Sequence, residues 1–435
     1  MGKRCAALAG GTPTHEDDVA LACGCGRFTL QDMRVLQVHN TYQQPGGEDT
    51  VAEREAALLR AAGHTVIEYR RSNQEIAEFN LWQKLALPKR MIWAGDARRD
   101  LRRILRQERP DVAHFHNTFL MISPAAYAVC RELGVPVVQS LHNPRLLCPS
   151  ANFYRNGTVC QDCVAKTPPW PGIVHGCYRQ SRVQTALVAG MLTAHRLLRT
   201  WHRQVNAFVV FTNFYRQQFI AGGLPAEKIF VKPHFVEPDP GVRPAGQSGR
   251  YALFVGRLDP EKGVRTMLRA WRDVTGLPLK IRGDGQLRGE VERAIREHPA
   301  GAMELAARLS GSELVRLIKG AAFLVWPSEG YYETFGLVAI EAFACGVPVI
   351  ASNVGVGAEI VRDGRTGLHF AAGDPKDLAA KVAWALAHPT ELLAMGRRAR
   401  AEFEARYTAS KNLKILISIY ERCLAEQGHR RDARG

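Results

Sequence analysis

The chain has 435 residues, too many for one ordinary hydrophobic core, so its length predicts two or three domains. Hydrophobic residues make up 46% and charged residues 23% of it, which excludes a disordered chain. No apolar run reaches the ~18 residues of a membrane-spanning helix, and Glu16, Asp17 and Asp18 interrupt any secretory signal, so we expect a cytoplasmic protein.

The chain is strongly basic. Its formal charge is +16, and residues 33–236 alone hold 26 Lys and Arg against 14 Asp and Glu. Such a charge predicts an anionic partner, either nucleic acid, anionic lipid or a phosphorylated substrate. A basic surface that serves only solubility is the alternative.

Residues 1–32 have no periodic pattern and hold three cysteines among Gly, Ala and Asp. We expect them to be a disordered extension or the product of a misassigned start codon.

From Met33 to residue 236, short β-rich runs alternate with helical patterns such as Thr50–Ala62, which is typical of βαβ units on a parallel sheet. The expected strands are Val35–His39, Thr65–Tyr69, Asp111–His116, Pro136–Leu141, Ala207–Thr212 and Lys228–Lys232.

Two features of this first domain suggest binding. Gly46 and Gly47, between the first strand and the first helix, let a backbone approach a ligand closely, although an ordinary turn explains them equally well. His114 and His116 lie on one face of a predicted strand, and His142 ends the next one. A lone strand histidine is more often structural than catalytic.

Four cysteines with the spacing Cys-x11-Cys-x2-Cys-x13-Cys lie in an insert at residues 145–180: Cys148, Cys160, Cys163 and Cys177. This pattern fits a tetrahedral thiolate zinc site, and a bound metal would stabilise the loop-like segment around it, which has little hydrophobic core. Four reduced cysteines, or disulfides, are the alternatives. We predict a structural zinc, because four thiolates leave no open position for catalysis.

Two stretches concentrate the positive charge. Residues 84–109 hold nine Lys or Arg against three acids, and residues 179–203 hold five Arg and no acid. In the first stretch, Arg99, Arg102, Arg103 and Arg106 share one side of a predicted helix. They are best explained as the solvent-exposed face of a helix whose other face packs on the core. The sharper interpretation is a peripheral patch that meets anionic lipid on the inner face of a membrane.

Residues 237–250 contain three prolines and three glycines, which is typical of a linker. A second βα series occupies 251–410, and a last helix is expected over 411–428. Its predicted strands are Tyr251–Gly256, Leu279–Arg282, Ala321–Trp326 and Pro348–Ser352. Two such domains imply a cleft, with ligands at the carboxyl ends of the strands.

The most informative stretch is Pro327–Ala342, in which a strand leads through a loop into a helix expected to begin near Phe335. The free N–H groups of that helix start suit a diphosphate, and Gly336 allows a close approach. Glu333 lies on the loop and Glu341 about two turns into the helix. One carboxylate can therefore meet a sugar while the other accepts hydrogen bonds from ribose hydroxyls.

Gly256, Arg257 and Lys262 follow the first strand of the second domain. Both cations can contact phosphate oxygens, at about 1.5–3 kcal/mol for each charged hydrogen bond. They would stabilise charge that builds up on a leaving phosphate. Each motif alone is weak, but both follow strands of one domain in the right order.

Together these motifs resemble glycosyltransferase family 4, which has the GT-B fold, over about residues 33–425. The matching residues are Gly256-Arg257-Leu258…Lys262-Gly263, Glu333-x-Phe335-Gly336-x4-Glu341, Gly346–Ala351 and Gly364-x-Thr366-Gly367. The resemblance implies an α/β fold of two Rossmann-like parallel-sheet domains facing each other across a cleft. It makes 33–236 the acceptor domain and 251–410 the donor domain, with the last helix packed back on the first.

The resemblance also implies the roles of individual residues. Arg257 and Lys262 would hold the donor phosphates, with Glu333 at the transferred sugar and Glu341 at the ribose. The catalytic set is completed by His116, and the other donor-binding residues are Thr334, Phe335, Gly336, Gly256, Gly46 and Gly47. Some members of the family also carry a Cys-rich insert.

We therefore predict a retaining hexosyltransferase that uses a nucleotide diphosphate sugar and a glycan or lipid-linked acceptor in cell-surface polysaccharide synthesis. The sequence has no Asp-x-Asp motif, and we expect no catalytic metal and no nucleic acid partner. The alternatives are a GT-B nucleotide-sugar epimerase, which would need no acceptor, and a basic zinc-containing nucleic-acid-binding protein, whose binding would be salt-sensitive.

Overall fold

The computed structural model describes residues 32–432 except 44–45, 245–248, 308–310 and 332. Our expectation for residues 1–32 therefore falls almost entirely outside the described residues. No helix among those described is long and apolar enough to cross a membrane.

In the described part of the chain, six parallel strands form a first sheet in the order β2-β1-β3-β4-β7-β8. Every residue of the central strands β3, β4 and β7 is buried, as expected for a parallel sheet covered on both faces. The strands are β1 (Arg34–Thr41), β2 (Thr65–Ser72), β3 (Val112–Asn117), β4 (Val137–Ser140), β7 (Ala207–Val210) and β8 (Ile229–Val231).

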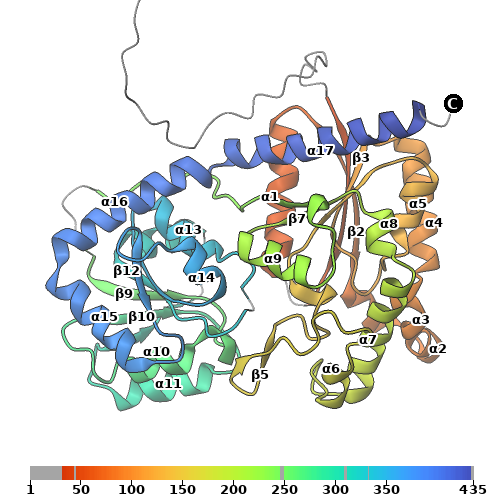
Figure 1. Cartoon of the computed structure of the whole chain (residues 1–435). Helices are drawn as coiled ribbons and strands as arrows, with labels where there is room; N and C mark the ends of the chain where they lie inside the picture. The colour runs from red at the N-terminus through yellow and green to blue at the C-terminus, as the bar shows by residue number, and fades with distance from the viewer. Residues whose placement is uncertain (1–31, 44–45, 245–248, 308–310, 332, 433–435) are drawn as a thin grey trace, which may run out of the picture. The chain divides into compact units, whose positions relative to one another are not determined.

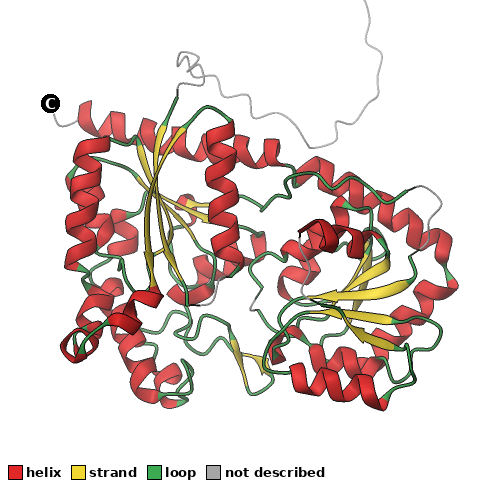
Figure 2. Ribbon diagram, turned by 180° about the vertical axis from the view of Figure 1, so that it is seen from behind, coloured by secondary structure: helices red, strands yellow, loops and turns green. Residues whose placement is uncertain are grey.

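Helices flank both faces of this sheet, as Figures 1 and 2 show. They are α1 (Gly47–Ala61), α2 (Leu81–Leu85), α3 (Leu87–Ile92), α4 (Gly95–Glu108), α5 (Ala126–Glu132), α6 (Trp170–Val174), α7 (Arg182–Leu197), α8 (Thr200–Gln204) and α9 (Asn213–Ala221). The Cys-rich insert adds a small antiparallel hairpin of β5 (Tyr154–Arg155) and β6 (Thr158–Val159).

A second sheet, also of six parallel strands among the described residues, has the order β11-β10-β9-β12-β13-β14. Its strands are β9 (Tyr251–Val255), β10 (Leu279–Arg282), β11 (Met303–Leu305), β12 (Ala321–Trp326), β13 (Val349–Ser352) and β14 (Gly367–Phe370). Its helices are α10 (Val264–Ala270), α11 (Arg288–Glu297), α12 (Gly311–Lys319), α13 (Leu337–Ala344), α14 (Gly355–Ile360), α15 (Pro375–Ala387) and α16 (Pro389–Arg406).

The strand orders locate the ligand crevices. Strand order reverses between β1 and β3 in the first sheet and between β9 and β12 in the second. Ligands of open α/β sheets bind outside the carboxyl ends of the strands at such switch points. The predicted binding loops, after β1 and β3 and after β9 and β12, all lie at these two places. The predicted α/β fold of two Rossmann-like parallel-sheet domains is confirmed.

The last helix, α17 (Ala409–Asp432), continues from the second half of the chain onto the first sheet (Figure 1). The Tyr420 hydroxyl lies 2.7 Å from Nδ1 of His114 on β3, and the Asn412 side chain donates to the carbonyl oxygen of Pro233 at 2.5 Å. Because Tyr420 is fully buried, this helix is part of the hydrophobic core of the first half.

Four elements of the structure differ from the prediction. The strands β11 (Met-Glu-Leu) and β14 (Gly-Leu-His-Phe) were missed because neither has a run of apolar residues. The helix α13 begins at Leu337, two residues after Phe335, because Gly336 has a left-handed φ of +85° that a helix cannot include. The helix α1 begins three residues before Thr50, with Gly46 as its N-cap.

Candidate active site

The second switch point is built from two loops that are packed against each other. Gly263, after β9, has φ +67°, and a Cβ atom there would lie 1.8 Å from the carbonyl oxygen of Pro327, after β12. The backbone N–H of Glu329 also donates to the carbonyl oxygen of Glu261 at 3.0 Å. Only glycine fits at position 263, so this residue fixes the distance between the loops.

Lys262 and Glu333, predicted from separate motifs, form an ion pair across these loops. Both side chains are mostly buried. Burial, with the nearby charge of Arg257 next, lowers the pKa of Lys262 to about 7, and the charges of Glu261 and Asp259 oppose this shift. An adjacent carboxylate favours the charged form of a lysine, so the pair places a positive charge beside a carboxylate at the carboxyl ends of β9 and β12.

Arg257 is more exposed and turns towards its own loop. Its guanidinium bonds to the Asp259 carboxylate at 2.9 Å and approaches Glu261 at 3.5 Å. A phosphate at this site would therefore compete with two carboxylates for the guanidinium of Arg257. Gly256, the residue before Arg257, donates its backbone N–H to the carbonyl oxygen of Arg282 at 3.0 Å.

Glu341 projects from α13, whose start is shaped by Gly336. A Cβ atom at position 336 would lie 2.2 Å from the indole ring of Trp326, so packing as well as φ requires glycine. Burial raises the pKa of Glu341, and the charges of Arg54 and Arg282 partly oppose this rise. Arg54 belongs to α1, and sequence reasoning missed it because an arginine on an amphipathic helix carries no motif.

The side chains of Phe335 and Thr334, both predicted to bind the donor, make contacts within the protein. The Phe335 ring is 2% exposed and packs edge-on against His234, with centroids 5.0 Å apart, and near Tyr407. Thr334 donates through its hydroxyl to the carbonyl oxygen of His142 at 3.1 Å. Because the Phe335 ring is buried, a donor contact at this residue would be made by its backbone, and its donor-binding role stays a prediction.

His116, at the end of β3, is buried at the first switch point. Its Nδ1 lies 3.0 Å from Nε2 of His142, and its Nε2 lies 3.2 Å from the Gln37 side-chain nitrogen. Burial, with the charge of His114 next, lowers the pKa of His116 to about 3. A neutral imidazole is therefore expected at physiological pH.

His116 belongs to a buried polar cluster, which we define as Glu55, His114, His116 and Lys232. The Lys232 ammonium lies 2.6 Å from one Glu55 oxygen, and His114 and His116 lie 3.0 and 3.4 Å from the other. A metal site needs at least three His, Cys, Asp or Glu side chains close together. Among the described residues only Glu55, His114 and His116 form such a group, with their ligand atoms within 4.8 Å of one another. Because an ammonium already neutralises this carboxylate, we assign no metal to the cluster.

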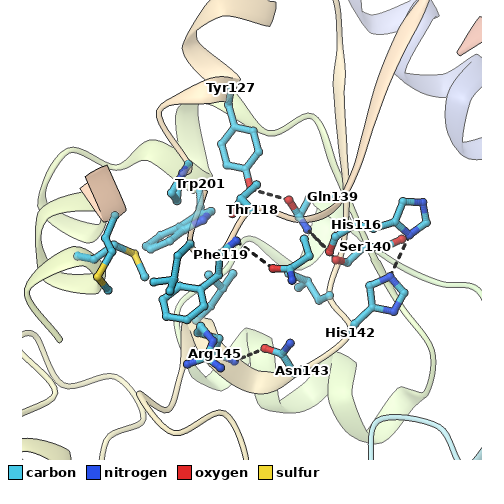
Figure 3. A pocket seen from close by; sticks show the side chains of 17 residues that line it. His116, Thr118, Phe119, Tyr127, Gln139, Ser140, His142, Asn143, Arg145 and Trp201 are labelled. Carbon is cyan, nitrogen blue, oxygen red and sulfur yellow. Dashed lines mark hydrogen bonds between the residues drawn. The ribbon is translucent and has the colours of Figure 1, made fainter. Parts of the chain in front are cut away.

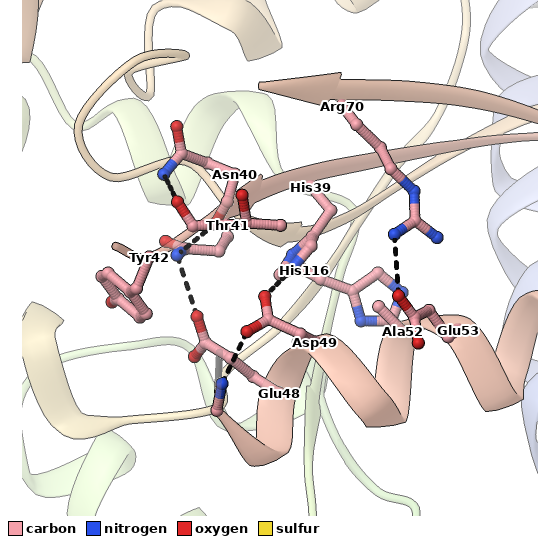
Figure 4. Close-up of polar contacts among 12 residues, drawn as sticks. His39, Asn40, Thr41, Tyr42, Glu48, Asp49, Ala52, Glu53, Arg70 and His116 are labelled. Atoms are coloured by element: carbon pink, nitrogen blue, oxygen red, sulfur yellow. Dashed lines mark hydrogen bonds and ion pairs between the residues drawn. The ribbon is translucent and has the colours of Figure 1, made fainter. Parts of the chain in front are cut away.

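Gly46 is the N-cap of α1 and Gly47 is its first residue. Figure 4 shows the polar contacts at this helix start, where His39, Glu48 and Asp49 lie together. The N–H of Gly46 donates to the Asp49 carboxylate at 2.7 Å, and Asp49 lies 2.6 Å from Nε2 of His39. Both glycines are exposed, and no described atom lies within 4 Å of a Cβ placed on either. Internal packing does not require glycine here, so the predicted close approach of a ligand stays a prediction.

Glu48, which follows these glycines, was missed. Its carboxylate accepts from the Asn117 amide at 2.9 Å and from the Asn143 amide at 3.4 Å. Burial, reinforced by the neighbouring charge of Asp49, raises its pKa to about 8. The available signal was an acid placed directly after a glycine pair at a helix start.

A cavity opens at the carboxyl ends of β3 and β4 (Figure 3). One part of its wall is polar, with His116, Asn117, His142, Asn143 and Arg145. The other part is apolar, and its residues include Met91, Phe119, Leu120, Met191 and Trp201. Such a mixed wall suits a molecule with both hydroxyl groups and an apolar part.

The predicted zinc ligands also come together. Cys148, Cys160, Cys163 and Cys177 line one small cavity next to the β5–β6 hairpin, and all four are free thiols. No three of their sulfur atoms lie within 4.8 Å of one another.

The two parallel sheets, with the loops after β9 and β12 packed together at the second switch point, define an α/β protein of the GT-B class. Residues 45–240 match the family described as Glycosyltransferase Family 4, and residues 238–402 match the family described as Glycosyl transferases group 1. The chain belongs to this group of glycosyltransferases.

Similar proteins include an uncharacterised glycosyltransferase of Methanocaldococcus jannaschii, 33% identical over 39% of this chain and 48% of the relative. D-inositol 3-phosphate glycosyltransferase 2 of Catenulispora acidiphila is 35% identical over 40% of this chain and 43% of the relative. The chain thus matches less than half the length of either relative. Anabaena HepE, solved with UDP-glucose, shares the fold with a TM-score of 0.62 at 15% identity, over 89% of this chain and 100% of HepE.

Proposed function

We propose that the protein transfers a hexose-type sugar, with retention of anomeric configuration, from a nucleotide diphosphate sugar to a glycan or lipid-linked acceptor in cell-surface polysaccharide synthesis. The observation that carries this proposal is the juxtaposition of Lys262, Glu333 and the start of α13 at the second switch point. Cations and a helix N-terminus beside a carboxylate suit a diphosphate joined to a sugar. The family and the UDP-glucose bound to HepE support the donor class.

In the proposed reaction, the bond between the sugar anomeric carbon and the phosphate oxygen breaks, and a bond to the acceptor hydroxyl oxygen forms on the same face. The acceptor proton passes to the departing phosphate oxygen, so the nucleotide leaves as a diphosphate. Lys262 and Arg257 stabilise the negative charge that grows on that phosphate. Glu333 orients the transferred sugar, Glu341 holds the ribose, and neutral His116 donates a hydrogen bond near the sugar.

The first test is a thermal-shift screen of UDP, GDP, ADP, dTDP and their sugars, followed by transfer assays with the sugar that binds. We expect nucleotide release that depends on added acceptor and an NMR coupling constant that reports the donor's anomeric configuration in the product. Sugar conversion without acceptor would indicate the epimerase instead, and an inverted product would contradict the same-face reaction.

For the acceptor, we propose a lipid-linked molecule met at an anionic membrane surface. The helices near the cavity carry exposed apolar side chains, with Trp82 78%, Val183 71% and Leu197 73% exposed. The same helices hold exposed cations, Lys84 and Lys89 on α2 and α3 and Arg182 on α7. Met91 and Met191, on α3 and α7, line the cavity itself, so an acceptor lipid held by these helices lies close to its wall.

Vesicle sedimentation tests this membrane contact. We expect binding to phosphatidylglycerol-rich vesicles, less binding to phosphatidylcholine vesicles, and at least a fivefold loss in the Trp82→Glu/Leu85→Glu variant. Leu386→Glu/Leu393→Glu, which changes exposed leucines of α15 and α16, is the matched control. Equal binding of all three proteins, or none to anionic vesicles, would contradict the proposal.

A further inference from the structure

The Cys-rich insert contains little regular structure. Within it the chain turns back through Asn156 and Gly157, whose φ values of +52° and +81° form a two-residue hairpin turn. Left-handed φ values recur at other residues of this segment that are not glycine: Ala151, Phe153, Ala165, Arg179 and Gln180. Each such residue opposes folding, so another interaction must hold the segment in this conformation.

The four cysteines lie where that interaction is needed. Cys148 precedes the hairpin, Cys160 and Cys163 follow it, and Cys177 comes after α6, yet all four line one small cavity. Gly172 donates its N–H to the Cys163 sulfur at 3.2 Å. A Cβ atom at position 172 would lie only 3.3 Å from that sulfur, so glycine allows the close approach.

Arginines lie near the sulfur atoms. The Arg155 guanidinium, which also pairs with the Asp162 carboxylate at 2.7 Å, interacts electrostatically with Cys160 and Cys177, and Arg196 interacts with Cys163. A zinc ion with four thiolates carries a net charge of −2, and neighbouring cations and N–H groups stabilise such a centre. Four thiols beside arginines are therefore better suited to a tetrathiolate zinc than to an uncharged core.

The hairpin that these cysteines flank reaches the donor loop. A Cβ atom at Gly330, in the loop after β12, would lie 2.9 Å from the ring of Tyr154 on β5. The ring thus rests on the backbone of the loop that carries Glu333, and glycine at position 330 makes room for it. Whatever fixes the hairpin also limits the movement of this loop.

We propose that Cys148, Cys160, Cys163 and Cys177 bind one structural zinc ion, and that this zinc holds Tyr154 against the loop of residues 327–336. Zinc–sulfur bonds of about 2.3 Å require the sulfur atoms to approach one another more closely than they do without the ion. With four thiolate ligands the zinc has no open position and takes no part in chemistry.

The test begins with metal analysis of the full chain, purified through a tag that binds no metal and without chelator. We expect about one zinc per chain, with less than a tenth of it left in Cys160→Ser and Cys163→Ser, while Cys423→Ser keeps it as the matched control. Absence of zinc, zinc that survives Cys160→Ser, or an intact mass about 4 Da below that of the reduced chain, which indicates two disulfides, would overturn the proposal.

Because the serine variants can fail to fold, a second measurement uses the wild-type chain. Zinc is removed with a chromophoric chelator, and hydrogen exchange of residues 327–336 is compared before and after, with β9 as an internal reference. We expect exchange in the loop to rise at least fivefold, and unchanged exchange would overturn the link to the loop. The assignment of this loop to the donor rests on the proposed function, but neither readout uses a donor or acceptor, so either proposal can fail alone.

Discussion

The two switch points of this protein are built in contrasting ways. At the second, Lys262 and Glu333 stand in loops directly after β9 and β12, within short motifs. At the first, the cluster behind His116 joins Glu55 on α1, His114 on β3 and Lys232 after β8, with Tyr420 of α17 against His114. The second site joins two motif-bearing loops that are 71 residues apart in the chain, whereas the first joins residues from four parts of the chain, up to 306 residues apart.

The difference predicts that the second switch point serves mainly the proposed reaction and the first mainly stability, with His116 belonging to both. The loop charges at the second switch point are less deeply buried than the cluster. They can therefore exchange their partners for a phosphate, and their removal should affect binding and turnover more than folding. The cluster at the first switch point is almost free of solvent, and each charge there depends on the others. Its removal should affect folding most.

The largest expected effect is the loss of the Glu55–Lys232 pair. Lys232→Met leaves a buried carboxylate without its ammonium, and we expect the free energy of unfolding to fall by about 3–5 kcal/mol. Chemical denaturation measures this, with Lys411→Met, at an exposed position of α17, as the control. The double variant Glu55→Leu/Lys232→Met should regain part of this loss, because it removes both charges. A loss of less than about 1 kcal/mol in Lys232→Met would show that the cluster does not stabilise the core.

The next effect divides the two glutamates of the donor loop and helix. We expect Glu341→Gln to raise the donor Kd about tenfold or more, because it weakens the bonds to ribose, and Glu333→Gln to lower kcat by a larger factor than it raises Kd. Calorimetry and saturating-donor kinetics measure the two quantities, with Glu297→Gln on α11 as the control. Equal changes in Kd for both variants, with kcat intact, would remove the division of roles.

The smallest expected effect concerns Glu48. Its pKa is raised from an ordinary 4.5 to about 8, so between these values the folded state holds a proton that the unfolded state has lost. Stability must then fall as pH rises from about 5 to 8, and this fall should shrink in Glu48→Gln, by on the order of 1 kcal/mol. Denaturation at pH 5, 6.5 and 8 checks this against Glu53→Gln, and identical pH dependence in wild type and Glu48→Gln would contradict it.

Sequence reasoning worked where structure is local. Hydrophobic runs predicted most strands of both sheets, because buried parallel strands are apolar along their whole length. The sequence placed Lys262 and Glu333 at one end of the second sheet because each follows a strand of that sheet, and the structure shows them as an ion pair there. Arg54 and Glu48 were not readable, because their surroundings are set by residues from other elements. The burial of the Phe335 ring was not readable either, because a motif does not show which way a side chain packs.

The most direct test of the central claim, that the second switch point stabilises charge on the departing phosphate, is the donor Kd by calorimetry beside kcat for Lys262→Ala. If Lys262 acts mainly in the transition state, kcat falls by at least tenfold, or about 1.4 kcal/mol, while Kd changes less. Arg257→Lys should be impaired as well, since an ammonium cannot reproduce the guanidinium fork on phosphate oxygens. A raised Kd with unchanged kcat in Lys262→Ala would make this lysine a simple binding residue and contradict the account.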